Sequence, residues 1–188
     1  MIDATIKDVY YYPTCFHKFF PLTRSKLVMS QPSRREIMDG FEAARARTFY
    51  FMAKALIDEL GEEPGREVIW ETVREMSKSS GEATRKSYEE EGKENTWENH
   101  RAENGPVYSV AWIGGTTQNK PDLKVIEYTY CPLGAAFTRM GKEAEEIGDI
   151  YCSVTDDAFW SDFNPEWRVK REKTFSRDGV CRLVWRRN

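Results

Sequence analysis

The sequence contains no apolar run that approaches the roughly 20 residues a helix needs to cross a bilayer. Its first residues, MIDATIKDVYYYP, show no basic head followed by an apolar stretch, which a secretion signal would have. The chain also has no internal repeat and no low-complexity tract. These absences argue against a membrane protein and a secreted one, so we expect a cytoplasmic protein with no membrane partner.

Cysteine is scarce and forms no CxxC pair, which removes the usual signature of a zinc finger. The four cysteines lie far apart in the chain, at Cys15, Cys131, Cys152 and Cys181. In the cytoplasm we expect them to be reduced. We therefore predict no cofactor. Zinc is the alternative, held by the last three thiols with His100 or His17 as a fourth ligand.

The chain has 188 residues, of which 40% are hydrophobic and 13% aromatic, enough for a folded domain with a sizeable core. Its net charge of −3 hides an asymmetry, because residues 166–188 carry 8 basic against 3 acidic side chains. We interpret this basic segment as a solvated hairpin face. It has no recognisable nucleic-acid-binding motif, so we predict no nucleic-acid partner.

The first part of the chain after residue 32 shows helical patterns. Ser33 and Glu36 form the S-x-x-E pattern of a capping box, and Gly61 ends the helix that follows. A second helix is predicted from Pro64 to a break at residues 79–81. Before these helices, residues 1–32 are predicted to form an aromatic arm, which would suit contact with a second subunit in a homo-oligomer.

Strand patterns dominate from residue 106 onward, after a polar insert at 82–105. The predicted strands are 107–113, 123–130, 149–154, 167–175 and 180–187, the last two joined by a turn that contains Gly179. Helices at 33–91 followed by antiparallel strands at 106–188 indicate an α+β fold. We predict a single domain over residues 1–188, with the helices packed on one face of an antiparallel sheet.

Cys131 stands where an apolar strand pattern stops, in the stretch YTYCPLGAAF. Pro132 suits the first position of a helix, so Cys131 is the predicted N-cap of a helix that reaches about Met140. The helix dipole and free N–H groups there favour a thiolate nucleophile, or alternatively hold a substrate carboxylate. A buried, inert cysteine is the competing interpretation. The residue types leave both open.

Other side chains add chemistry to this junction. Alternation along the predicted strands turns Cys152 and Cys181 toward the apolar side of the sheet. A carboxylate at Asp156 or Asp157 could act as a general base, although one of them also suits a helix N-cap. The remaining candidates for ligand contact are Glu127, on either an exposed or a buried face, and Trp97 with His100, as a lid.

The stretch from CPLGAAF through IYCSVTDDAFW and FNPEWRVKREKTF to VCRLVW resembles the L-2-amino-thiazoline-4-carboxylic acid hydrolase family over residues 123–187. The resemblance implies a small-molecule hydrolase that acts on a C–N or C–S bond of a cyclic amidine-like acid. The positions that match the family motif are Cys131, Cys152, Asp156 and Cys181. Arg171, Lys173 or the amides of residues 133 and 134 would then hold the substrate carboxylate.

A second interpretation differs in class. The final strand is also similar to 4-vinyl reductase ligand-binding domains, which would make the protein a non-catalytic sensor or carrier of a small ligand. The many Trp and Tyr residues fit a cavity that encloses such a ligand.

Overall fold

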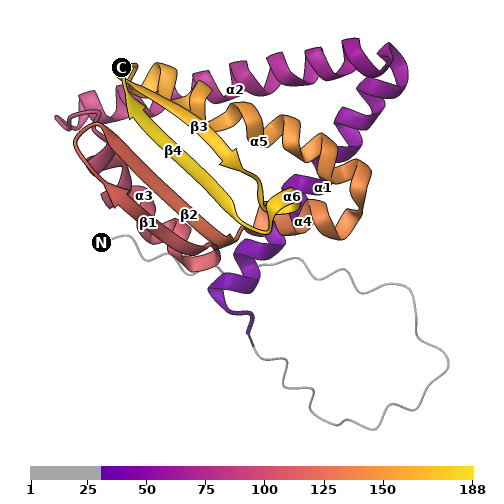
Figure 1. Cartoon of the computed structure of the whole chain (residues 1–188), viewed down its shortest axis with the longest axis horizontal. Helices are drawn as coiled ribbons and strands as arrows, with labels where there is room; N and C mark the ends of the chain where they lie inside the picture. Colours follow the sequence, from indigo (N-terminus) through magenta and orange to yellow (C-terminus); the bar gives the residue numbers. More distant parts are fainter. Residues whose placement is uncertain (1–30) are drawn as a thin grey trace, which may run out of the picture. The chain divides into compact units, whose positions relative to one another are not determined.

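The computed structural model describes residues 31–188, and these form an α+β body. Two long helices, α1 (Arg34–Leu60) and α2 (Glu62–Glu90), precede a four-stranded antiparallel sheet in the order β1-β2-β4-β3 (Figure 1). The other elements are α3 (Trp97–Ala111), β1 (Ile113–Asn119), β2 (Leu123–Tyr130), α4 (Pro132–Met140), α5 (Lys142–Phe163), β3 (Trp167–Lys173), α6 (Phe175–Asp178) and β4 (Cys181–Arg187). The predicted fold class is confirmed.

The start of α1 follows the predicted capping box. The Ser33 hydroxyl accepts a hydrogen bond from the Glu36 amide at 3.2 Å, and the Glu36 carboxylate accepts one from the Ser33 amide at 2.7 Å. Both otherwise unpaired donors are thereby satisfied. The helix ends at Gly61, whose φ of 91° reverses the chain into α2.

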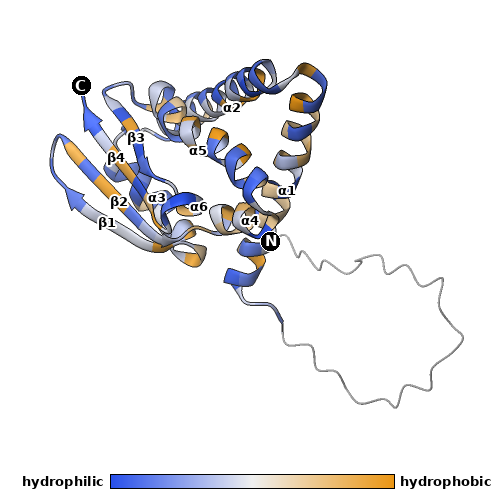
Figure 2. Ribbon diagram, turned by 45° about the vertical axis from the view of Figure 1, so that its right-hand side comes forward, coloured by the Kyte–Doolittle hydropathy of each residue, from blue (hydrophilic) through white to orange (hydrophobic). Residues whose placement is uncertain are grey.

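The inner face of the sheet carries the core. Ile126 and Tyr128 of β2 alternate with outward residues, and so do Cys181, Leu183 and Trp185 of β4. Figure 2 shows the resulting hydrophobic segments along the central strands. The predicted apolar environment of Cys181 is therefore confirmed, and this face meets α3 and α5 in one aromatic cluster.

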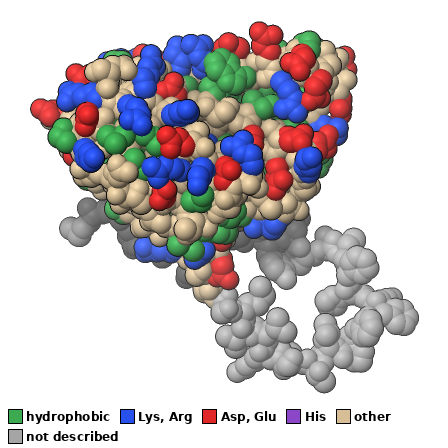
Figure 3. Space-filling view, viewed as in Figure 1, with side chains coloured by type: hydrophobic (Ala, Val, Ile, Leu, Met, Phe, Trp, Pro, Cys, Tyr) green, Lys and Arg blue, Asp and Glu red, His purple; other side chains and the backbone are tan. Residues whose placement is uncertain are grey.

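The outer face of the sheet is covered by charged side chains. Arg182 on β4 bonds to Glu127 on β2 and, at 2.9 Å, to Glu172 on β3. Figure 3 shows basic and acidic groups interspersed over the viewed surface. The basic residues near the end of the chain therefore belong to a hairpin with mixed charges, β3–α6–β4.

The predicted strand at 107–113 is wrong, because these residues are mostly the end of α3. Thr96 caps that helix by accepting the Asn99 amide at 3.2 Å, and the helix continues through Pro106 to Ala111. The strand β1 begins only at Ile113, in a glycine-rich stretch with few strand-forming side chains. It forms because it pairs along β2 at the edge of the sheet.

The predicted strand at 149–154 is also wrong, since these residues lie within α5. Ile147, Tyr151, Val154 and Ala158 recur at intervals of three and four, and they pack against α1, α2 and α4. The six-residue apolar window that indicated a strand is compatible with a buried helix as well.

The predicted break at residues 79–81 does not occur, and α2 continues to Glu90. Gly81 is instead the point where α2 meets α5, which lies beside it (Figure 1). The polar insert at 82–105 is consequently the end of α2, a short connection and the start of α3.

Residues 1–30 of the predicted aromatic arm lie outside the described residues, so its role and the homo-oligomer stay predictions. Among the helices of residues 31–188, none combines the length and apolar character that crossing a bilayer requires.

Candidate functional site

A cavity of about 460 Å³ lies between the inner face of the sheet and the helices. Its volume falls in the range of sites that enclose small molecules. Many aromatic residues line it: Trp97, His100, Tyr108, Trp112, Tyr128, Tyr151, Phe159, Trp160 and Trp185. The charged groups at the cavity are a cluster around Arg171, the pair of Arg45 with Glu42, and Arg101. Ser77, Ser80 and Thr155 add hydroxyl groups.

The Arg171 cluster joins β3, α5 and β4 through one guanidinium. Arg171 donates to the Asp156 carboxylate, to the Cys152 carbonyl oxygen at 2.6 Å and to the Cys181 sulfur at 2.7 Å. Its side chain is only 12% exposed. Burial disfavours the charge of Arg171, but the negative charge of Asp156 favours it, and the pKa of Arg171 is raised. The cluster therefore holds Asp156 in a defined position at the cavity.

Cys131 is the N-cap of α4, as predicted, and its sulfur accepts the Gly134 amide at 3.4 Å. Burial nevertheless raises the pKa of its thiol, because desolvation outweighs that bond and the charge of Arg171. Burial likewise raises the pKa of Cys152 to about 11 and that of Cys181 to about 12. All three thiols are therefore held protonated near neutral pH.

This state of the thiols predicts slow alkylation. In native protein at pH 8, Cys131, Cys152 and Cys181 should react with iodoacetamide at least tenfold more slowly than after unfolding in urea, because only the thiolate attacks. Mass spectrometry of the labelled peptides measures each site separately. Rapid native labelling of Cys131 would instead establish a thiolate at the helix start.

Two carboxylates line the cavity: Glu42, which pairs with Arg45, and Asp156. Asp156 is 32% exposed, and one of its oxygens bonds to Arg171, while the other has no hydrogen bond within residues 31–188. Its charge contributes to raising the pKa of three tyrosines around it, after the larger effect of burial. These are Tyr108, Tyr128 and Tyr151. The second oxygen is therefore available to a water or a ligand.

Arg45 and Arg101 differ in their surroundings. Arg45 is 49% exposed and pairs with Glu42 at 2.6 Å. Arg101 lies half-buried on α3 and donates to the Tyr128 hydroxyl at 3.4 Å, a long hydrogen bond. Within the described chain, no carboxylate lies within 4.0 Å of Arg101. It is thus the cavity arginine that lacks an acidic partner there.

Trp97 and His100 both line the cavity, but as parts of its wall. Trp97 is 4% exposed, and Lys124 lies 5.0 Å from the centre of its ring. The His100 ring packs 5.3–5.4 Å from the rings of Phe159, Trp160 and Phe163. Both residues belong to α3, so they reach the cavity from a helix and not from a loop, and their role as a lid stays a prediction.

His100 makes the stability of the protein depend on pH. Burial, with help from Arg101, lowers the pKa of its imidazole from 6.5 to about 4. Between these values the unfolded chain binds the extra proton, so stability falls as pH drops from 6.5 toward 4. Wild type should lose about 2–3 kcal/mol over this interval through His100. Urea unfolding at pH 7 and pH 4.5 measures this loss in the free energy of unfolding. The His100→Gln variant should lose about 2–3 kcal/mol less than wild type between the two pH values.

Two predicted site residues lie outside the cavity. Asp157 accepts the Val169 amide at 2.8 Å and so ties α5 to β3. Glu127 lies on the outer face of the sheet, where it pairs with Arg182. Neither lines the cavity, because each side chain points to another partner. Lys173, predicted to hold the substrate carboxylate, does not line it either, whereas Trp97, His100, Cys131, Cys152, Asp156, Arg171 and Cys181 do.

The three cavity thiols do not form a recognisable metal site. In residues 31–188, no group of three or more His, Cys, Asp or Glu side chains is arranged to hold a metal ion. The Arg171 guanidinium lies among the thiols, and its positive charge disfavours a second cation. His17, one of the predicted ligands, lies outside the described residues.

Several cavity residues were absent from the sequence-based candidates. Thr155 and Phe159 follow Cys152 at intervals of three and seven, the spacing of one helix face. A helical interpretation of this segment would have placed them beside Asp156. Arg101 and Tyr108 had no comparable signal, because their segment was assigned in part to a polar loop and in part to a strand.

An α+β body with an aromatic cavity beside a partly buried ion pair has the kind of site in which small molecules are commonly bound. The chain is a member of the L-2-amino-thiazoline-4-carboxylic acid hydrolase family, whose model matches residues 42–185. This confirms the resemblance and extends it to α1, α2 and α3. No curated protein and no solved structure matches the chain.

Proposed function

We propose that the protein hydrolyses a small cyclic amidine-like acid, with Asp156 as the general base. One observation carries the proposal: within the cavity, Asp156 is fixed by Arg171 through one oxygen and keeps the other available. Membership of the hydrolase family supplies the substrate class. A carboxylate fixed in this way is suited to take a proton from an attacking water.

The chemistry is consistent for a 2-aminothiazoline ring opened at its C–S bond. Water attacks the carbon that lies between nitrogen and sulfur, and Asp156 accepts one of its protons. The C–S bond breaks as the C=O bond forms. The two protons of the water end on the ring nitrogen and on the departing sulfur, so atoms and charges balance.

Cys131 has a different role from the predicted nucleophile in this scheme. Since burial raises the pKa of its thiol, Cys131 is neither a ready nucleophile nor a ready acid at neutral pH, and it acts as part of the cavity wall. The departing sulfur takes its proton from Asp156, which received it from the attacking water. Cys152 and Cys181 contact Arg171 and complete the environment of the base.

Incubation with L-2-amino-thiazoline-4-carboxylate tests the proposal. We expect a product heavier by one water, detected by mass spectrometry, together with a new thiol detected by a colorimetric disulfide reagent. Boiled protein is the control. No product from folded protein, over a range of pH and substrate concentration, would contradict hydrolysis of this substrate.

Ligand binding without turnover is the second candidate function. It is favoured by the protonated thiols and by the protein partners that Arg171 already has, since these reduce the number of cavity groups that could act on a bound ligand. Binding of the same compound, measured by calorimetry, without any product would support this alternative.

A further inference from the structure

A substrate carboxylate needs a cationic or N–H partner at the cavity, and the predicted partners either bond to other groups or lie away from the cavity. Arg171 bonds to Asp156, Cys152 and Cys181. The amide of Gly134 donates to the Cys131 sulfur. Lys173 is exposed and does not line the cavity.

Arg101 is a cationic group at the cavity that is available to a substrate carboxylate. It lines the cavity from α3, and its side chain makes one long hydrogen bond within residues 31–188, to the Tyr128 hydroxyl at 3.4 Å. A guanidinium presents several N–H groups in a planar fork that matches the two oxygens of a carboxylate. Arg45, the other arginine of the cavity wall, is more exposed and already paired with Glu42.

The position of Tyr128 links Arg101 to the reacting end of the site. Arg101 bonds to the Tyr128 hydroxyl, and Asp156 lies close enough to contribute to raising the pKa of that hydroxyl, after the larger effect of burial. Arg101, Tyr128 and Asp156 all line the same cavity, so a ligand bound at Arg101 occupies the cavity that also contains Asp156. When Arg101 binds the carboxylate of a substrate, the Tyr128 hydroxyl can donate a second hydrogen bond to the same carboxylate.

We propose that Arg101 is the specificity-determining residue that binds the carboxylate of the substrate, with Tyr128 as a second donor. This inference rests on the proposed substrate class, but it concerns recognition and can be tested without turnover. It predicts that the cavity binds a ring that carries a carboxylate more tightly than the same ring without one.

The test compares two probes that differ only in the carboxylate: L-2-amino-thiazoline-4-carboxylate and 2-aminothiazoline. Wild type should bind the acid about tenfold to hundredfold more tightly by calorimetry, the range of a charge-assisted contact. Arg101→Met should abolish this preference, with the affinity for 2-aminothiazoline unchanged. Arg101→Lys should keep part of it, because the charge remains without the fork.

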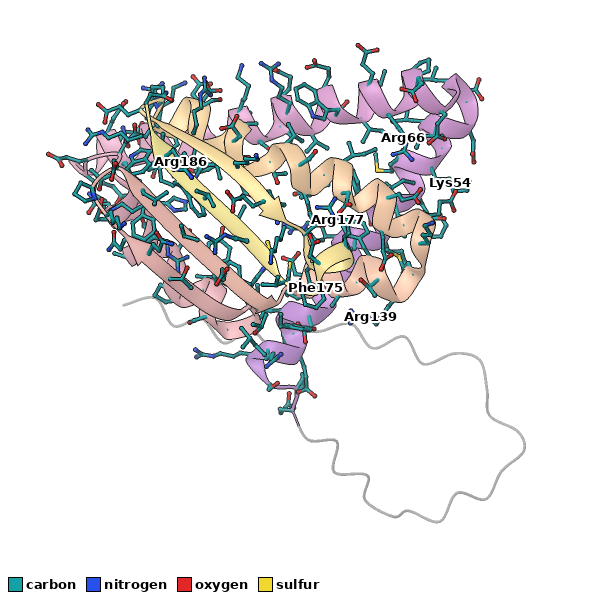
Figure 4. All side chains as sticks on the ribbon, viewed as in Figure 1. Lys54, Arg66, Arg139, Phe175, Arg177 and Arg186 are labelled. Atoms are coloured by element: carbon teal, nitrogen blue, oxygen red, sulfur yellow. The ribbon has the colours of Figure 1, made fainter. Side chains whose placement is uncertain are left out.

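Arg186→Met is the matched control, because it removes the same charge from an exposed site. Figure 4 labels Arg186 toward the C-terminal end of β4, and it does not line the cavity. It should retain the wild-type preference. Equal affinity of wild type for both probes, or a preference that survives in Arg101→Met, would overturn the inference. Binding with the expected preference but without product would contradict only the proposed hydrolysis.

Discussion

Asp156→Asn should lower kcat on L-2-amino-thiazoline-4-carboxylate by about 100-fold to 10,000-fold, the usual contribution of a general base. The amide has nearly the same shape, and its oxygen can still accept the bond from Arg171. It cannot take a proton from water at neutral pH. The loss should therefore appear in kcat, with a smaller change in KM, in steady-state assays of product formation.

Asp157→Asn is the control for this change, since it makes the same substitution one residue later. Asp157 bonds to the Val169 amide outside the cavity, and an asparagine oxygen can keep that bond. We expect its kcat to stay within a fewfold of wild type. Comparable losses in both variants would indicate a general effect of the helix. Full activity in Asp156→Asn would remove Asp156 from the role of base.

Gly81→Ala should destabilise the protein by about 2 kcal/mol net, because overpacking there costs about 3 kcal/mol, the upper part of its usual range. A Cβ atom at Gly81 would lie 2.1 Å from the carbonyl oxygen of Phe159 and 3.2 Å from the amide nitrogen of Phe163. Both contacts are with backbone, so α2 and α5 would have to separate. The higher helix propensity of alanine offsets only about 1 kcal/mol of this cost. Urea unfolding measures the difference.

Gly40→Ala provides the matched control in α1. A Cβ atom at Gly40 would have no neighbour within 4 Å, so only the gain in helix propensity applies. This variant should be more stable than wild type by up to about 1 kcal/mol. If Gly81→Ala were also as stable as wild type, the close approach of α2 to α5 would be contradicted. Because Phe159 also lines the cavity, Gly81→Ala should weaken ligand binding as well.

The sequence by itself determined the elements whose signals are local. The side chains of Ser33 and Glu36 each bond to the backbone of the other residue, three positions away. Proline favours the first position of a helix through its own backbone geometry, and Pro132 occupies that position in α4. The period of two along β4 likewise identified the buried side of Cys181. Such patterns depend on neighbours in the chain, so they could be recognised before the fold was known.

Tertiary structure decided the elements whose local signals were ambiguous. Residues 149–154 became helix because α5 packs between α2 and the sheet, and β1 became a strand because β2 offers an unpaired edge. It also decided the chemistry of the site. The N-cap position alone favours a thiolate at Cys131, but burial outweighs it. Burial and the distance between Asp156 and Arg171 arise from contacts remote in the sequence, which only the folded chain brings together.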